Sequence, residues 1–267
     1  MATADYQVQS LARAAAILTA FSADQPALTI GEIARRCGLP RSTVHRLVVN
    51  LVRLGFLARD PLTDHYRLGL LMVELGAIAL SRLDLRERAM PAMERLAERT
   101  GEAVFLAVLD HNASVYVQKV EGRQGLRMTA HIGRRAPLHC TASGKILLAS
   151  LPDEQVRRIA AETGLPAWTA RTITEIAPLL AHLVEVRRKG YAVDDEESEE
   201  GLVGIAAPVR GADGATVAAL TIAGPSSRLL PGGRSELAPL VVATADDASG
   251  LLGFRRPPGP AAAPGAR

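Results

Sequence analysis

Short hydroxyl side chains and cationic side chains gather at the start of one segment of this sequence. They are Arg41, Ser42, Thr43, His45 and Arg46. Guanidinium, hydroxyl and imidazole groups can hydrogen-bond to base edges and to phosphates in a DNA groove. An ordinary solvated helix carries the same residue types, so this segment alone leaves two interpretations open: a DNA-reading helix and an amphipathic surface helix.

The residues around this cluster have the apolar spacing of a helix. The apolar positions are Val44, Leu47, Val48, Leu51 and Leu54. They fall on one side of a helix, and Pro40 suits its first turn because proline lacks an N–H. Asn50 and Arg53 share the polar side with Val49, which is less polar than a base-contacting position requires. We therefore expect Asn50 and Arg53 to make peripheral or phosphate contacts.

The preceding segment favours the DNA-reading interpretation. Thr29 and Glu32 form a capping-box pattern at the start of a short helix. Gly38 follows that helix, and glycine readily adopts the positive φ that ends a helix. A short capped helix, a glycine turn and a longer helix with a polar start are typical of a helix-turn-helix.

The following segment predicts a wing. Strand-like residues 56–59 and 65–68 enclose the polar turn 60–64. We expect Arg59 and Arg67 on this hairpin to contact phosphates. Residues 1–69 are therefore predicted to form a winged helix-turn-helix DNA-binding domain.

Length, charge and cysteine content limit the number of domains and the location of the protein. A chain of 267 residues is long enough for two domains. Residues 1–70 contain eight Arg, no Lys and five acidic residues, a net charge of +3, whereas 23 basic and 23 acidic residues balance in residues 71–267. Only two cysteines are present, and neither a signal peptide nor a membrane span is evident. We expect a cytoplasmic protein with no membrane partner.

Residues 70–83 are apolar on more than one face, so a helix there must be buried. Packing against a second copy of the chain would make it a linker and dimerisation helix. An ordinary buried helix inside one domain remains the alternative.

Residues 84–254 predict an α+β domain with an antiparallel sheet. The expected helices are 85–100, 141–151, 153–162, 175–190 and 235–252, and the expected strands are 102–110, 114–121, 126–130, 203–210 and 215–223. Residues 255–267 hold four Pro, four Ala and two Gly, which predicts a disordered tail.

A second candidate site lies at the predicted helix start 140–144. Small residues and unpaired N–H groups there favour an anion, and the Ser143 hydroxyl can add a hydrogen bond. Ser143-Gly144-Lys145 departs from the nucleotide-binding phosphate loop, which needs Gly at position 139 and Ser or Thr at 146. His139 and Cys140 lack a second pair at metal spacing, and residues 194–200 lack the order of a calcium loop. No catalytic triad or nucleophile motif is present, so we expect no enzyme, metal or cofactor.

Residues 8–69 resemble the DNA-binding domain of the IclR (isocitrate lyase regulator) family of bacterial transcription factors. The matching runs are Val8–Arg13, Leu28–Ala34, Leu39–Leu47 and Tyr66–Gly69. The later residues resemble the family's GAF-like effector-binding domain. The matching runs are Gly133–His139, Ala142–Lys145, Gly190-Tyr191, Asp194–Glu197, Gly201, Ile205–Val209 and Gly224-Pro225.

The resemblance implies a two-domain α+β regulator with a linker helix and a pocket for a small carboxylic or aromatic acid. The residues it points to are Leu126, Met128, Ala142, Ser143, Asp194, Gly204, Thr221 and Ala223. Gly204 stands where some members have cysteine, and Thr221 and Ala223 stand where some have serine. These departures predict a roomier, more apolar pocket than one for an acid of two or three carbons.

We therefore expect a transcriptional regulator, a repressor or an activator, that acts as a homodimer or a dimer of dimers on a double-stranded DNA operator. Two alternatives remain at this point. One is an enzyme with an accessory winged helix, and the other is a sensor module whose winged helix binds protein.

Overall fold

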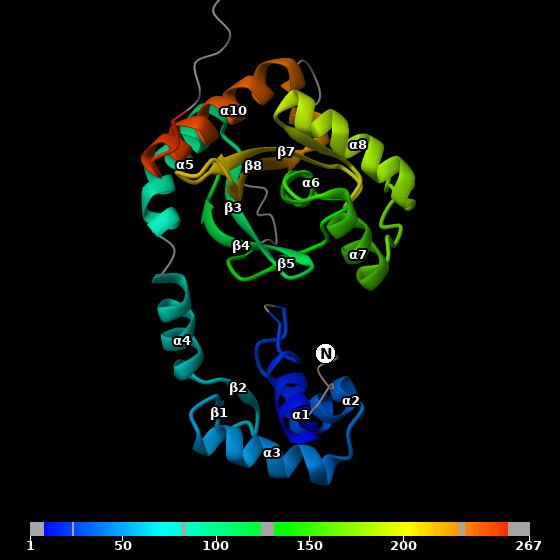
Figure 1. Ribbon diagram of the computed structural model, residues 1–267. Helices are drawn as coiled ribbons and strands as arrows, with labels where there is room; N and C mark the ends of the chain where they lie inside the picture. Colours follow the sequence, from blue (N-terminus) through cyan, green and yellow to red (C-terminus); the bar gives the residue numbers. More distant parts are fainter. Residues whose placement is uncertain (1–7, 23, 82–83, 124–130, 230–232, 256–267) are drawn as a thin grey trace, which may run out of the picture. The chain divides into compact units, whose positions relative to one another are not determined.

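The computed structural model describes residues 8–22, 24–81, 84–123, 131–229 and 233–255 (Figure 1). The chain divides into two compact units, Met1–Leu83 and Asp84–Arg267. Each unit has its own hydrophobic core and is described separately. None of the helices in the described segments is long and apolar enough to cross a membrane.

The first unit contains four helices and a small hairpin within its described residues. Its elements are α1 (Gln9–Leu18), α2 (Ile30–Cys37), α3 (Arg41–Arg53), β1 (Leu57–Arg59), β2 (Tyr66–Leu68) and α4 (Leu70–Ser81). Strands β1 and β2 pair antiparallel and form the wing. Leu28 bridges to Tyr66, so the segment before α2 adds a third line of backbone hydrogen bonds beside the wing.

The helix-turn-helix forms as predicted, with the expected capping box and glycine turn. The Thr29 hydroxyl accepts a hydrogen bond from the backbone N–H of Glu32, whose carboxylate in turn accepts one from the backbone N–H of Thr29. Gly38 ends α2 with φ of 64°, a left-handed conformation that glycine adopts without a steric penalty. Ile17, Ile33 and Val44 are fully buried between α1, α2 and α3, so the core fixes the orientation of α3.

Helix α4 carries exposed apolar side chains. Leu70 is 85% exposed, Val73 68% and Ile78 56%. The prediction of a helix over residues 70–83 agrees with α4, which is described as far as Ser81.

In its described residues, the second unit is built on a six-stranded antiparallel sheet with the strand order β5-β4-β3-β8-β7-β6. The strands are β3 (Ala103–Asp110), β4 (Ala113–Val120), β5 (Arg135–Ala136), β6 (Ala192–Asp195), β7 (Leu202–Arg210) and β8 (Thr216–Pro225). The central strands β3 and β8 pair over the register that joins Phe105 to Thr221. This antiparallel sheet with flanking helices is the predicted α+β architecture.

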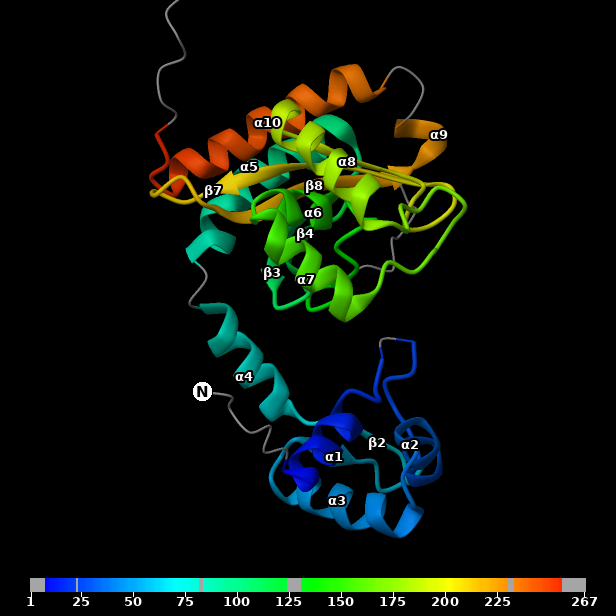
Figure 2. The ribbon, with the colours of Figure 1, turned by 45° about the vertical axis from the view of Figure 1, so that its right-hand side comes forward.

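Helices cover both faces of this sheet (Figures 1 and 2). The helices of the unit are α5 (Asp84–Thr100), α6 (Ala142–Ala149), α7 (Asp153–Thr163), α8 (Ile176–Lys189), α9 (Ser226–Leu229) and α10 (Gly233–Leu251). α5 and α10 lie side by side on one face, and α6 packs on the other. α7 and α8 cover the outer side of α6, and one apolar cluster joins the three helices to Ala206 and Ala219 of the sheet.

The structure differs from the prediction at two edge strands. Strands β5 and β6 are not among the strands expected from the sequence. Among the described residues, each pairs with a single neighbour, β6 with β7 and β5 with β4, so neither needs the apolar alternation of a central strand. The predicted strand 126–130 and the predicted tail, apart from Arg255, lie outside the described residues.

Candidate DNA-binding and effector-binding sites

Helix α3 presents the predicted DNA-reading residues on the side opposite its buried stripe. Val44, Val48 and Leu51 face the core. The exposed residues of the helix include Arg41, Ser42, His45, Arg46, Asn50 and Arg53, and Thr43 is half-buried. No acidic residue lies in the first turn, so nothing on the helix start repels a phosphate. Val49 is 49% exposed between these polar side chains, which leaves an apolar interruption along the polar side.

Two of these side chains already have contacts within the unit. A Cβ built on Gly31 would stand 2.9 Å from Nη2 of Arg41, so this guanidinium lies against the start of α2. Asn50 Nδ2 donates a hydrogen bond of 2.8 Å to the backbone oxygen of Arg46. Asn50 is thereby held against its own helix, which fits a peripheral position better than a base-reading one.

The wing places its two predicted arginines differently. Arg59 Nη2 lies 2.5 Å from Asp64 Oδ1, and both side chains are more than half exposed. The hydrogen bond from Arg59 to Asp64, together with the carboxylate charge, raises the pKa of Arg59. Arg67 is exposed on β2 opposite Ala58. Arg67 is thus exposed to solvent. Arg59 must break its ion pair with Asp64 before it can bind a phosphate.

In the second unit, the sheet register assembles the residues implied for the effector. Asp194 of β6 pairs with Gly204 of β7, which pairs with Ala223 of β8. Thr221 lies two residues from Ala223 and therefore points to the same face of the sheet. All four residues are buried.

Helix α6 begins directly above this row. A Cβ built on Gly204 would stand 3.3 Å from the Cβ of Ala142 and 3.6 Å from that of Asp194. The small residue thus lets α6 approach the sheet closely. The prediction that Gly204 makes the pocket roomier is wrong at this position, because Ala142 takes up the space that a larger side chain would need.

Hydrogen bonds fix the first turn of α6. Thr141 Oγ1 accepts a hydrogen bond of 3.1 Å from the backbone N–H of Gly144 and donates one of 2.6 Å to the backbone oxygen of Pro137. Ser114 Oγ on β4 donates a hydrogen bond of 3.1 Å to Ser143 Oγ. Ser143 therefore faces the sheet from a capped helix start, and α6 agrees with the helix expected over residues 141–151.

Asp194 is the buried acid of the site. Its Oδ1 accepts hydrogen bonds from the backbone N–H groups of Glu197 (2.8 Å) and Ser198 (3.3 Å), and its Oδ2 accepts one from Ser198 Oγ. Burial raises the pKa of Asp194 to about 6, although these hydrogen bonds act in the opposite direction.

Thr221 is the second buried polar group of the row. Its Oγ1 is buried, and it has no hydrogen-bond partner among the described residues. A buried hydroxyl without a partner costs about 1–3 kcal/mol, so a bound polar group that reached it would be stabilised.

An aromatic wall of the same row was missed in the sequence. Phe105 pairs with Thr221 across β3 and β8, and its ring centroid lies 5.0 Å from that of Tyr116. The two rings pack with Ala103 and Ala223. Burial raises the pKa of Tyr116, so its phenol is neutral. Only the strand register relates Phe105 and Tyr116 to Ser143, so the sequence alone did not indicate them. The predicted residues Leu126 and Met128 lie outside the described residues.

Lys145 does not offer its charge to a ligand. Its side chain is fully buried, and Nζ donates hydrogen bonds to Glu197 Oε1 and to the backbone oxygen of Val193. A Cβ on Gly144 would stand 2.4 Å from the backbone oxygen of Leu138, so that glycine serves close packing. The Ser143-Gly144-Lys145 run therefore joins α6 to the turn after β6, and its lysine cannot serve as a phosphate-binding lysine.

His139 and Cys140 are likewise built into the interior. His139 Nε2 lies 3.1 Å from the backbone oxygen of Pro166, and burial raises the pKa of the Cys140 thiol to about 12. A protonated thiol is a poor metal ligand. Within the described segments, no group of three or more His, Cys, Asp and Glu side chains could hold a metal ion.

A winged helix-turn-helix followed by a sheet-based domain with an internal polar row defines a two-domain DNA-binding regulator. Two family models match this chain: the IclR helix-turn-helix domain over residues 10–61 and the bacterial transcriptional regulator IclR C-terminal domain over residues 77–250. The chain therefore belongs to the IclR family of bacterial transcriptional regulators.

Individual relatives agree with this assignment. The transcriptional repressor IclR of Escherichia coli is 32% identical, over 96% of this chain and 94% of the relative. The transcriptional regulator KdgR of Escherichia coli is 36% identical, over 92% of this chain and 94% of the relative. Both relatives are named as transcriptional regulators or repressors.

Solved structures show the same fold. An IclR homologue from Microbacterium hydrocarbonoxydans, complexed with 4-hydroxybenzoate, matches with a TM-score of 0.80 and 31% identity over 91% of this chain and 99% of that one. The IclR of Thermotoga maritima matches with a TM-score of 0.73 and 30% identity over 93% and 100%.

Proposed function

We propose that this protein binds a pseudo-palindromic double-stranded operator and that α3 enters the major groove. The observation that carries the proposal is that the buried stripe of α3 turns its polar side, including Arg46, to solvent. Base-reading contacts are assigned to the first two turns. The residues are Arg41, Ser42, Thr43, His45 and Arg46. Asn50, Arg53, Arg59 and Arg67 supply peripheral and phosphate contacts.

The proposed binding form is a homodimer or a dimer of dimers in the cytoplasm. Half-sites one or more helical turns apart require two copies of α3. The exposed Leu70, Val73 and Ile78 of α4 supply an apolar surface that a second copy can bury.

We further propose that operator binding responds to a carboxylic or aromatic acid between the start of α6 and the sheet. Ser143 and Thr221 offer hydroxyl groups, and the Thr221 hydroxyl lacks a partner within the described part of the chain. Phe105 and Tyr116 supply an aromatic wall suited to a ring. The 4-hydroxybenzoate in a structural relative is an acid of this class.

A ligand screen followed by a DNA-binding assay tests this proposal. Thermal-shift measurements on carboxylic and aromatic acids, with 4-hydroxybenzoate and pyruvate included, should find an acid that raises the melting temperature. The same acid should change the affinity for DNA from the region upstream of the chain's own coding sequence. Thr221→Val should abolish the thermal shift, whereas Thr244→Val on α10 should leave it unchanged.

Two outcomes would count against the proposal. If no acid shifted the melting temperature, the proposed effector binding would be rejected. The proposed DNA binding would be unaffected. If the full chain bound the upstream DNA no more tightly than unrelated DNA of equal length, the operator function would be rejected.

A further inference from the structure

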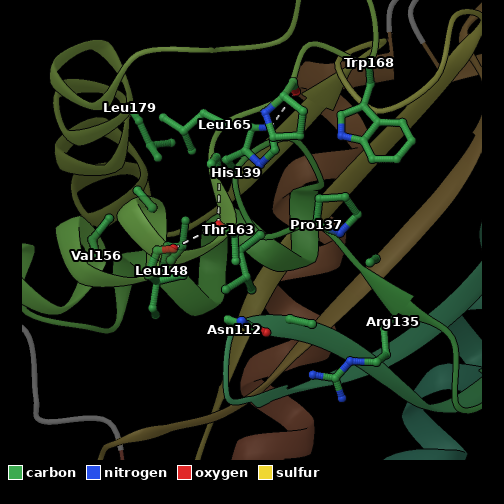
Figure 3. A pocket seen from close by; sticks show the side chains of 17 residues that line it. Asn112, Arg135, Pro137, His139, Leu148, Val156, Thr163, Leu165, Trp168 and Leu179 are labelled. Carbon is green, nitrogen blue, oxygen red and sulfur yellow. Dashed lines mark hydrogen bonds between the residues drawn. The ribbon is translucent and has the colours of Figure 1, made fainter. Parts of the chain in front are cut away.

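A separate cavity lies between the β4–β5 edge of the sheet and helices α6, α7 and α8 (Figure 3). Its volume is about 330 Å³. The apolar part of its wall comes from the segment before α6, from the end of α6, from α7 and the loop after it, and from α8. These residues include Leu138, Leu148, Val156, Ile159, Leu165 and Trp168. None of the described residues proposed for the effector lines this cavity.

The volume suits a small ring compound. Small-molecule pockets begin at about 300 Å³, and an apolar cavity of about 150 Å³ already holds benzene. Trp168 is 58% exposed and lies at the edge of the wall, so an occupant would reduce the contact of its indole with water. The space is thus large enough for a substituted monocyclic ligand.

One buried polar side chain in the wall has an unused acceptor. His139 is 4% exposed, and burial lowers its pKa, so the ring is neutral at pH 7. In that form the Nε2–H donates to the backbone oxygen of Pro166, 3.1 Å away. Nδ1 then carries a lone pair, and within the described part of the chain it makes no hydrogen bond. A ligand hydroxyl is the natural donor to such a nitrogen.

The wall offers no free positive charge. Arg135 is the only Lys or Arg among the described lining residues. Its Nη1 is paired with the carboxylate of Asp110, and its Nη2 donates a hydrogen bond of 2.9 Å to the backbone oxygen of Asp110. A ligand carboxylate would therefore enter an apolar space without a partner, which is costly.

We propose that this cavity is a second ligand site and that it takes a neutral, largely apolar ring compound with one hydroxyl group. It differs from the proposed effector site in place and in ligand charge. The bound compound contacts Leu138 and His139, which lie in the segment that leads into α6.

Three matched probes test the ligand class on the full chain. They are cyclooctanol, cyclooctane and cyclooctanecarboxylate. Trp168 is the only tryptophan in the sequence, and these probes do not absorb where it is excited, so its emission reports on the cavity. Cyclooctanol should give a saturable blue shift of the emission. Cyclooctane and the carboxylate should each bind about tenfold more weakly, because one lacks the donor and the other carries an unpaired charge.

A pair of neighbouring substitutions tests the location. Ala160 lines the cavity from α7, whereas Ala161 is exposed beside it and does not. Ala160→Phe should weaken cyclooctanol binding at least about tenfold, as expected when a filled site excludes a ligand, and Ala161→Phe should leave it unchanged. Nuclear Overhauser effects between cyclooctanol and the Trp168 indole protons provide a second test of location that needs no variant.

The proposal is overturned if cyclooctanol gives no saturable shift, or if the carboxylate binds as tightly as the alcohol. It is also overturned if the Overhauser contacts to Trp168 are absent at saturation. Equal cyclooctanol binding by folded Ala160→Phe and Ala161→Phe proteins would place the ligand elsewhere and would reject this cavity.

Discussion

Arg59 and Asp64 face each other across the wing, with Nη2 of the arginine 2.5 Å from Oδ1 of the aspartate. The pair lies at the hairpin that is proposed to track the DNA backbone. Asp64 has a positive φ of 56°, a conformation that Asn tolerates as well as Asp. A carboxylate at this place pairs with the arginine and repels phosphate, so we expect the wing to bind DNA less strongly than its arginine content suggests.

Asp64→Asn should therefore tighten DNA binding without regard to sequence. Freeing Arg59 should raise the affinity for operator and unrelated DNA alike by a few-fold and steepen the salt dependence by about one phosphate contact. Fluorescence anisotropy at several salt concentrations measures both quantities. Adding Arg59→Ala should cancel the gain. A gain that survives in the double variant would show that Arg59 is not responsible.

The buried ion pair predicts a strong effect on stability. Lys145→Met should destabilise the protein by about 3–5 kcal/mol, because it leaves the buried Glu197 carboxylate without its cation. Lys145→Met combined with Glu197→Gln should recover much of the loss, since both charges are then gone. Urea denaturation measures each step. A single variant as stable as the wild type would contradict the pairing.

Thr221→Val should not destabilise the protein as Lys145→Met does. Replacing a buried hydroxyl that has no partner among the described residues should leave stability unchanged or raise it by about 1 kcal/mol. Thr244 provides the matched control, since its buried hydroxyl donates a hydrogen bond of 2.9 Å to the backbone oxygen of Leu240. Thr244→Val should be destabilising. Equal losses in the two variants would show that the Thr221 hydroxyl is satisfied in solution.

The pH dependence of stability follows from Asp194. Its folded-state pKa is raised from 3.8 to about 6, so the unfolded chain loses this proton first as pH rises. The contribution to stability is fully present below the unfolded pKa and is lost as pH rises through about 6. The unfolding free energy of the wild type relative to Asp194→Asn should therefore fall between about pH 4 and pH 7. A difference that stays flat across this range would contradict the raised pKa.

Signals carried by a few neighbouring residues were predicted correctly from the sequence. The capping box at Thr29, the left-handed Gly38 and the buried stripe from Val44 depend on local spacing, and all three appear in the structure. The antiparallel character of the second unit also followed from the order of its elements.

Features that depend on strand register could not be predicted in this way. Phe105 and Thr221 are far apart in sequence and meet only because β3 pairs with β8. The close approach of Ala142 to Gly204 depends on how α6 packs on the sheet, so the missing side chain was misread as free space. Strand β6 was not predicted, because its acidic residues do not form the apolar alternation of a central strand. Among the described residues, it pairs only with β7.

The central claim is that α3 reads the operator. The most direct test compares Arg46→Ala with Arg157→Ala, which removes the same charge from an exposed position on α7. Anisotropy titrations with the chain's own upstream DNA and with unrelated DNA should show Arg46→Ala losing about 1–3 kcal/mol on the operator and less on unrelated DNA. Arg157→Ala should match the wild type on both. If Arg46→Ala bound the operator as tightly and as selectively as the wild type, the assignment of α3 as the reading helix would be contradicted.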